Sequence, residues 1–259
     1  MSDLVGVVGA LRRYPVKSML GEDLDTGEIT ERGLSGDRVR AVVDVSTGKV
    51  ASAKNPRLWR DLLTLDGVAP PGDAELSKLF GREVRLADTP PPQAELERSI
   101  PEEVLRQGVE QEVGHTITYL AAAAPGTFFD FAPLHLITTS TVRRIGELSA
   151  RGHMEALRYR PNLVIDTPGD GFPENTWAGA RLRLGSAELE VIVASPRCAV
   201  PTLAHGELPR DTDALRTVAR HNRVEVFDMG EQPCAGVYAR VLRPGEVRVG
   251  DEVRLTPAA

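Results

Sequence analysis

Cysteine is scarce in this chain: among its 259 residues, only Cys198 and Cys234 carry thiols. Two cysteines cannot form the disulfide framework of a small secreted domain, and these two lack the spacing of a zinc or iron–sulfur site. The sequence therefore excludes a four-cysteine cluster held by this chain. Cys198 lies in the segment SPRCAVP (residues 195–201), between two prolines and beside the cation Arg197.

Long hydrophobic runs and an excess of basic charge are also missing. No apolar run approaches the roughly 20 residues that span a bilayer, and the N-terminal MSDL lacks the basic and apolar regions of a secretion signal. We therefore expect a cytoplasmic protein with no membrane partner. The net charge of −6 argues against nucleic acid as a partner, because phosphate backbones attract basic surfaces. Local basic sites for a small anion are compatible with this charge.

Short strands joined by turns dominate the pattern of apolar residues. Residues 38–45 alternate between apolar and polar side chains and turn at 46–48 into a second strand, as in a hairpin. Further strands are predicted at 4–11, 84–86, 134–137, 163–166, 182–184, 189–194, 224–228, 237–242 and 252–255, and helices at 76–80, 141–150 and 211–219. The Pro-rich stretch 88–126 is predicted to be irregular apart from one helical turn near 101–105, as a domain junction or a long functional loop. The pattern predicts a mainly β (α+β) fold of two β-barrel-like domains, residues 1–125 and 126–259.

Two turn segments near the N-terminus carry residues suited to an anion. In YPVKSM (residues 14–19), Lys17 is a compact cation and Ser18 a hydroxyl donor, which suits a phosphate oxygen, although a solvated turn lysine is the simpler interpretation. In GLSGDRV (residues 33–39), Arg38 can fork onto a phosphate or a planar heterocycle. The alternative there is a surface pair of Asp37 and Arg38 in a hairpin turn.

A third segment and the cysteine add candidates from the second half. Arg160 and Asn162 flank a proline in RYRPNL, and the amide of Asn162 can read a pterin or purine edge or can simply bind nearby backbone. Thr138, Thr139 and Ser140 are N-cap candidates for the helix predicted at 141–150. The neighbouring Arg197 would favour the thiolate form of Cys198, which suits a nucleophile or a soft-metal ligand. The alternative is a buried cysteine that acts as a small hydrophobe, which is what we expect of Cys234.

In their order and spacing, these segments resemble the MOSC proteins, named for the C-terminal domain of molybdenum cofactor sulfurase. The resemblance covers nearly the whole chain, through YPVKS, LSGDR, SAKNPRL, PLHLITTSTV, RPNLVID, TWAGARLRLG, PRC and GVYARVLRPGEVRVGD. The chain is most similar to two-part members, in which a MOSC N-terminal β-barrel domain precedes the MOSC domain. That group includes the mitochondrial amidoxime-reducing component and bacterial reductases of N-hydroxylated bases.

The resemblance implies that the protein binds a molybdenum cofactor, whose organic part is a pyranopterin. By motif match, Cys198 would be both the catalytic residue and the thiolate ligand of molybdenum. The other cofactor contacts would be Lys17, Ser18 and Arg38 at the phosphate end, Arg160, Asn162 and Arg197 at the pterin, and Thr139 and Ser140 at a helix N-terminus.

The resemblance also implies an oxidoreductase that reduces N-hydroxylated compounds such as amidoximes, hydroxylamines and N-hydroxy bases. Some relatives append a ferredoxin-like domain, and we expect none in this protein, so electrons would come from a separate ferredoxin or flavoprotein reductase. Relatives often carry an acid where this chain has Ala204, and the adjacent His205 is either a replacement proton donor or a loop histidine without chemistry. Two other hypotheses stay open: a sulfur carrier with a persulfide on Cys198, and a binding module without chemistry.

Overall fold

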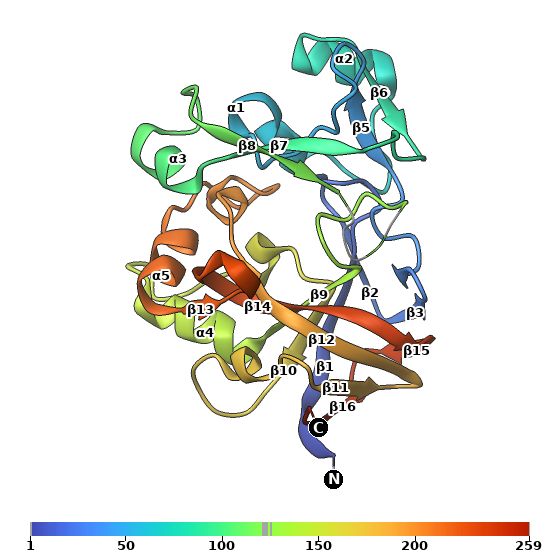
Figure 1. The fold of residues 1–259 in the computed structure, drawn as a ribbon, viewed down its shortest axis with the longest axis vertical. Coiled ribbons are helices and arrows are strands. Elements are labelled where there is room, and N and C mark those ends of the chain that lie inside the picture. The colour runs from blue at the N-terminus through green and yellow to red at the C-terminus, as the bar shows by residue number, and fades with distance from the viewer. Residues whose placement is uncertain (1, 121–123, 125, 259) are drawn as a thin grey trace.

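Strands outnumber helices in the computed structural model, which describes residues 2–120, 124 and 126–258 (Figure 1). The strands are β1 (Asp3–Arg13), β2 (Glu22–Leu24), β3 (Thr26–Thr30), β4 (Gly33–Leu34), β5 (Ala41–Asp44), β6 (Val84–Ala87), β7 (Glu95–Ser99), β8 (His115–Tyr119), β9 (Leu134–Thr138), β10 (Leu163–Asp166), β11 (Arg181–Leu184), β12 (Ala187–Pro196), β13 (Arg223–Glu225), β14 (Glu231–Arg243), β15 (Gly245–Arg248) and β16 (Glu252–Thr256). The helices are α1 (Pro56–Trp59), α2 (Asp73–Phe80), α3 (Pro101–Gln107), α4 (Thr139–Leu148) and α5 (Asp213–His221). The prediction of a mainly β fold with a few helices is confirmed.

Seven strands close into a β-barrel in the order β10-β9-β14-β12-β11-β16-β1, and β1 pairs again with β10. The strands β9 and β10 run parallel, whereas the other neighbours in this circuit are antiparallel. The N-terminal strand β1 therefore lies among strands from the second half of the chain, and β3 likewise pairs with β15. The division into domains 1–125 and 126–259 stays a prediction, and the barrel takes strands from both sides of it.

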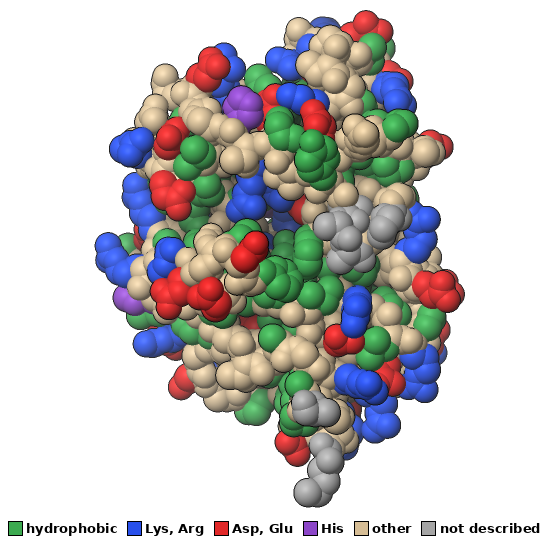
Figure 2. Space-filling model, viewed as in Figure 1, with side chains coloured by type: hydrophobic (Ala, Val, Ile, Leu, Met, Phe, Trp, Pro, Cys, Tyr) green, Lys and Arg blue, Asp and Glu red, His purple; other side chains and the backbone are tan. Residues whose placement is uncertain are grey.

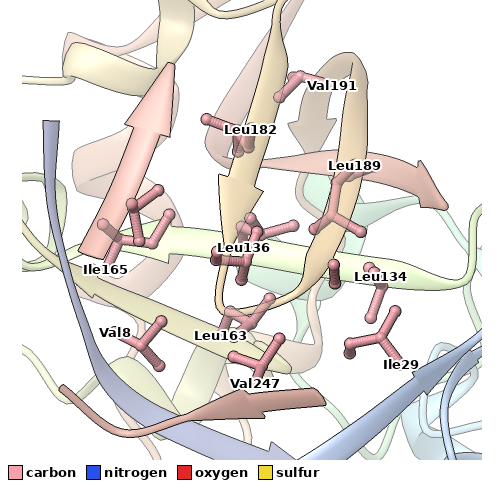
Figure 3. Packing of buried hydrophobic residues seen from close by; sticks show 14 of the residues in the cluster. Val8, Ile29, Leu134, Leu136, Leu163, Ile165, Leu182, Leu189, Val191 and Val247 are labelled. Carbon is pink, nitrogen blue, oxygen red and sulfur yellow. The ribbon is translucent and has the colours of Figure 1, made fainter. Parts of the chain in front are cut away.

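The barrel interior follows from the two-residue period of its strands. Along β12, Leu189 and Val191 are fully buried, while the residues that alternate with them, Glu188 and Glu190, point outward. Figure 3 shows how apolar side chains from different strands, among them Leu182 and Leu189, meet inside the barrel. Burial of one such side chain stabilises a fold by roughly 1.5–3 kcal/mol. This interior holds the strand ends that form one side of the site described below.

A second group of apolar side chains lies outside the barrel, around α1, α2, β5 and β6 at the top of Figure 1. Trp59 packs there against Phe80, with ring centroids 5.1 Å apart.

Among the described residues, no helix is both long and apolar enough to cross a membrane.

The stretch 88–126 differs from its prediction, because β7 and β8 form a hairpin there with α3 between them. The prediction of an irregular stretch was wrong for β7 and β8, whereas α3 lies where a helical turn was predicted. Residues 121–123 and 125 lie outside the described residues. Of the five residues of β7, only Leu96 and Ser99 are buried, so the hairpin shows no apolar alternation. Its other ties are polar: Glu97 pairs with Lys49 at 2.8 Å and accepts a hydrogen bond from Asn55 at 2.9 Å.

Candidate functional site

A cavity of about 410 Å³ lies between the barrel and the β7–β8 hairpin. Figure 2 shows it as a hollow with Lys and Arg side chains inside and hydrophobic side chains beside it. Its lining comes from segments far apart in the sequence: 17–18, 38, 52–54, 98, 118–119, 129–135, 159–162, 193–200, 226–229 and 238. A site of this composition exists only when the chain is folded.

The structure brings together seven of the nine residues that the sequence assigned to a site. These seven line the cavity: Lys17, Ser18, Arg38, Arg160, Asn162, Arg197 and Cys198. The other two, Thr139 and Ser140, are not among the described residues that line it.

Thr139 and Ser140 are placed elsewhere because the N-terminus of α4 is already occupied by the protein itself. The buried carboxylate of Glu174 accepts hydrogen bonds there, including one from the Thr138 hydroxyl at 2.7 Å. The Thr139 hydroxyl donates to Asp166 at 2.9 Å, and Ser140 is fully buried. The helix also begins two residues earlier than predicted, with Thr138 as its N-cap. The hydroxyls at this helix end are therefore used by protein groups. Anion contacts of Thr139 and Ser140 stay a prediction, which this geometry does not favour.

Lys17 is held by an acidic residue that the sequence reasoning missed. Its ammonium donates to Asp130 at 2.6 Å and to the Phe128 carbonyl at 2.8 Å, and Lys54 approaches Asp130 at 3.2 Å. Burial lowers the pKa of Lys17 to about 8, against the opposing effect of Asp130. Burial raises the pKa of Asp130, but Lys17 and Lys54 outweigh it and hold that pKa well below its ordinary value. Asp130 is thus ionised at neutral pH, and the pKa of Lys17, about 8, lies close to neutral pH.

Two guanidinium groups lie over the ring of Tyr14, at the start of the YPVKS motif. The carbon of the Arg160 guanidinium is 4.2 Å from the ring centroid and that of Arg38 is 4.9 Å away. Arg38 also pairs with Asp37, and Arg160 donates to the Met19 carbonyl at 2.7 Å. Burial lowers the pKa of Arg160 to about 10, so the side chain is cationic at neutral pH. The electron-rich face of a buried tyrosine stabilises cations that would otherwise repel each other.

The backbone is strained at the same cavity. Among the described non-glycine residues, five have a positive φ: Ser18 (65°), Arg38 (47°), Gln93 (56°), Arg160 (54°) and Phe227 (48°). All of these except Gln93 line the cavity. A left-handed conformation at such a residue costs on the order of 1–3 kcal/mol, and such strain concentrates at functional sites. The fold therefore accepts strain at several points to direct side chains toward one space.

Asn162 serves the framework of the site. Its side-chain oxygen accepts from the His135 backbone N–H at 3.2 Å, and its amide nitrogen donates to the Arg12 carbonyl at 3.2 Å. The same oxygen is 3.5 Å from a nitrogen of Arg38. Because these bonds join β1 to β9, Asn162 fixes the strand ends that carry the neighbouring cations.

Cys198 and Arg197 follow directly after β12. Cys198 is a partly exposed free thiol, whereas Cys234 is buried and burial raises its pKa to about 11. Arg197 donates to the Tyr159 carbonyl at 2.7 Å and to the Ser195 hydroxyl at 2.6 Å. The more accessible thiol is therefore Cys198, and Cys234 is buried, as expected of it.

Two histidines lie close to the site, and only one lines it. His135 is buried in the wall of the cavity, and burial, with the charge of Arg197, lowers its pKa well below the ordinary range. His205 is buried outside the lining, where its Nδ1 donates to the Leu203 carbonyl at 3.0 Å. Burial and the charge of Arg160 lower the pKa of His205 to about 3. His205 is therefore neutral and enclosed, which favours a histidine without chemistry over a proton donor.

The charge of the cavity is opposite to that of the chain. Its described lining contains the cations Lys17, Arg38, Lys54, Arg98, Arg160 and Arg197 against the carboxylates Asp130 and Asp228. The chain as a whole carries a net charge of −6. Among the described residues, no group of three or more His, Cys, Asp or Glu side chains could hold a metal ion.

Family models match both parts of the chain. The model of the MOSC domain matches residues 124–254, and the model of the MOSC N-terminal beta barrel domain matches residues 5–70. The chain belongs to the MOSC family. In this MOSC protein the match at residues 5–70 includes Lys17, Ser18 and Arg38. The match at residues 124–254 includes Arg160, Arg197 and Cys198.

Curated relatives of this MOSC protein cover almost its whole length at low identity. Mitochondrial amidoxime reducing component 2 of Homo sapiens is 26% identical over 284 residues, covering 96% of this chain and 83% of the relative. Mitochondrial amidoxime-reducing component 1 of Homo sapiens is 27% identical over 288 residues, covering 97% and 83%. The crystal structure of the YUAD protein from Bacillus subtilis shares the fold, with a TM-score of 0.51 and 15% identity over the whole of both chains.

Proposed function

We propose that this protein is a molybdenum-cofactor-dependent oxidoreductase that reduces N-hydroxylated compounds. The observation that carries the proposal is the placement of Cys198 in one cavity with Lys17, Arg38, Arg160 and Arg197. The names of the curated relatives support the reaction class, and their identity of 24–27% leaves the reaction of this chain to be measured.

The residues present fit an anionic pyranopterin. A phosphate group matches a buried ammonium, a hydroxyl and a guanidinium, which Lys17, Ser18 and Arg38 provide. Nη1 of Arg160 and Nε of Arg197 are buried without a hydrogen-bond partner, so each has a donor available to a bound anion. The thiolate of Cys198 is a soft ligand, suited to a metal already bound by sulfur. We leave Thr139 and Ser140 out of this set, because their hydroxyls bind protein groups.

When bound, the cofactor would supply a metal centre that exchanges two electrons and takes up an oxygen atom. In the overall reaction the N–O bond of the substrate breaks, two electrons and two protons are consumed, and water leaves. A separate reduced protein, a ferredoxin or a flavoprotein reductase, would supply the electrons.

In this proposal the residues of the chain bind, orient and enclose the cofactor. Tyr14 and Asn162 keep Arg38 and Arg160 aimed into the cavity, and Asp130 fixes Lys17 and Lys54. A rigid, preformed set of donors lowers the cost of ordering the cofactor.

The proposal is tested with protein made in a host that synthesises the molybdenum cofactor. We expect about one molybdenum per chain, and reduction of benzamidoxime when a chemically reduced viologen supplies electrons. Cys198→Ser should lower this activity at least about a hundredfold, because removing a catalytic group typically costs 10² or more. Cys234→Ala removes the other thiol and should leave the activity of the folded protein near that of the parent.

One result would reject the reductase in favour of the sulfur carrier. That result is protein without molybdenum from a competent host, with a cyanide-labile sulfur that Cys198→Ser eliminates. A partly exposed thiol can carry such a persulfide.

A further inference from the structure

Aromatic side chains form one side of the cavity, from its mouth inward. Three rings follow one another in space there: Phe227, Phe131 and Tyr238. The ring centroids are 5.9 Å apart between Phe227 and Phe131 and 5.5 Å apart between Phe131 and Tyr238. The ring of His135 continues the series, 5.8 Å from that of Tyr238. We name Phe227, Phe131 and Tyr238 the aromatic wall. All three line the cavity together with the cationic residues.

The inner end of the aromatic wall is fixed by the barrel. Tyr238 on β14 is the register partner of His135 on β9 and of Val193 on β12, so the three side chains form one row on the cavity face. Gly236 lets the strands approach, because a Cβ there would lie 2.6 Å from Nε2 of His135. His135 in turn lies 3.2 Å from Arg197, the residue before Cys198. The wall therefore leads from the solvent toward the thiol.

The outer end of the aromatic wall, Phe227, is exposed to solvent. Exposure is unusual for a large apolar side chain on a strained backbone. Phe227 is 55% exposed and its backbone is left-handed, with φ at 48°. Met229 at the same mouth is 52% exposed and Tyr119 on β8 is 65% exposed. Strain and exposure both cost stability, and neither is needed to fill the core. Their concentration at the cavity mouth points to a ligand that covers them.

We infer that the aromatic wall binds a planar aromatic group of the substrate, and that Phe227 determines this preference. The inference rests on the proposed function and narrows it to aryl and heteroaryl N-hydroxy compounds over aliphatic ones. A cavity of about 410 Å³ accepts a small molecule and not a protein segment. A ring stacked on Phe131 and Tyr238 would direct its polar end toward the cationic residues and Cys198, since these share the cavity with the wall.

The test compares benzamidoxime with acetamidoxime on the molybdenum-loaded protein. We expect kcat/KM to favour the aryl compound by about tenfold or more, because an aromatic contact and the buried ring area both contribute. Phe227→Asn removes the ring and tolerates a positive φ, and should lower this ratio about threefold to tenfold. Phe227→Tyr should keep the ratio. Leu79→Ser, at an equally exposed apolar residue on α2 away from the cavity, should leave it unchanged.

A binding measurement separates the wall from the reaction. The neutral fluorescent probe 2-naphthamide, titrated into the same proteins and followed by anisotropy, should bind Phe227→Asn about threefold to tenfold more weakly than the parent. Equal kcat/KM for both amidoximes, with equal probe binding by parent and Phe227→Asn, would overturn the inference and leave the reductase intact. Absence of any reduction by molybdenum-loaded protein would reject the reductase, and the probe titration would then decide whether the wall binds aromatic groups.

Discussion

Inside the barrel, Leu182, Leu189 and Val191 are fully buried among other apolar side chains. In the cavity beside it, Lys17 and Arg160 are almost as deeply buried, but among other charges and strained backbone. The first arrangement stabilises the fold. The second costs free energy, which Asp130 and Tyr14 offset only in part, because Nη1 of Arg160 has no hydrogen-bond partner. The apolar interior of the barrel therefore supplies stability to the fold. This stability offsets the free-energy cost of the unpaired donors in the cavity.

The largest expected effect breaks the barrel side of this comparison. Leu182→Ala should lower the free energy of unfolding by about 2–5 kcal/mol, because it leaves a hole in a closed interior. Chemical denaturation measures it, and molybdenum content per folded chain should not change. Leu4→Ala is the matched control at a 54% exposed residue of β1 and should cost less than about 0.5 kcal/mol. A similar loss from both variants would contradict the role given to the barrel interior.

A smaller effect is expected from a substitution in the cavity. It should change the binding of the cofactor and not the stability of the fold. Arg160→Met should weaken cofactor retention by about 1.5–3 kcal/mol, the value of a hydrogen bond to a charged group. The free energy of unfolding should change by less than about 1 kcal/mol, because the lost bond to Met19 is offset by removal of the unpartnered Nη1. Molybdenum content after dialysis and denaturation curves measure the two quantities.

Arg181→Met serves as the matched control for that variant, since Arg181 is largely exposed on the barrel surface and does not line the cavity. It should alter neither quantity. Full molybdenum retention by Arg160→Met would remove Arg160 from the proposed binding set.

The smallest expected effect is the pH dependence caused by Lys17, which changes stability and anion binding in opposite directions. The pKa of Lys17 is about 8 in the folded chain and near 10.5 when unfolded, so the unfolded chain binds more protons between these values. The contribution of this group to stability therefore rises from pH 8 upward, while its attraction for anions falls. Sulfate binding to cofactor-free protein should weaken about tenfold between pH 7 and pH 9, in proportion to protonated Lys17. Calorimetry measures it, and the same dependence in Lys17→Met would exclude Lys17 as its source.

Much of the barrel could be predicted because its strands have a clear period. The hairpin of β11 and β12 shows alternating buried and exposed residues, and the sequence predicted it. The β7–β8 hairpin was missed because its pairing rests on polar contacts such as Glu97 with Lys49. Local periodicity reports burial on one face, and it gives no signal where a strand is mostly polar.

The candidate site was predicted in part, for a related reason. Lys17, Arg38 and Arg160 were found because their turn segments resemble those of a known family. Asp130 and Lys54 were missed, since a lone acid and a lone lysine carry no signal until they are seen 3.2 Å apart. Thr139 was misplaced because its sequence shows an open helix end, while Asp166 and the buried Glu174 fill that end.

By itself the sequence determined the mainly β class, the scarcity of thiols that singles out Cys198, and the family to which the motifs belong. These follow from composition, period and local order, which a linear chain contains. Only the tertiary structure decided that a chain of net negative charge has a cationic cavity, that Asp130 lies within it, and that an aromatic wall leads to it. Charge, burial and pKa depend on which segments meet in space, and that is fixed when the barrel closes.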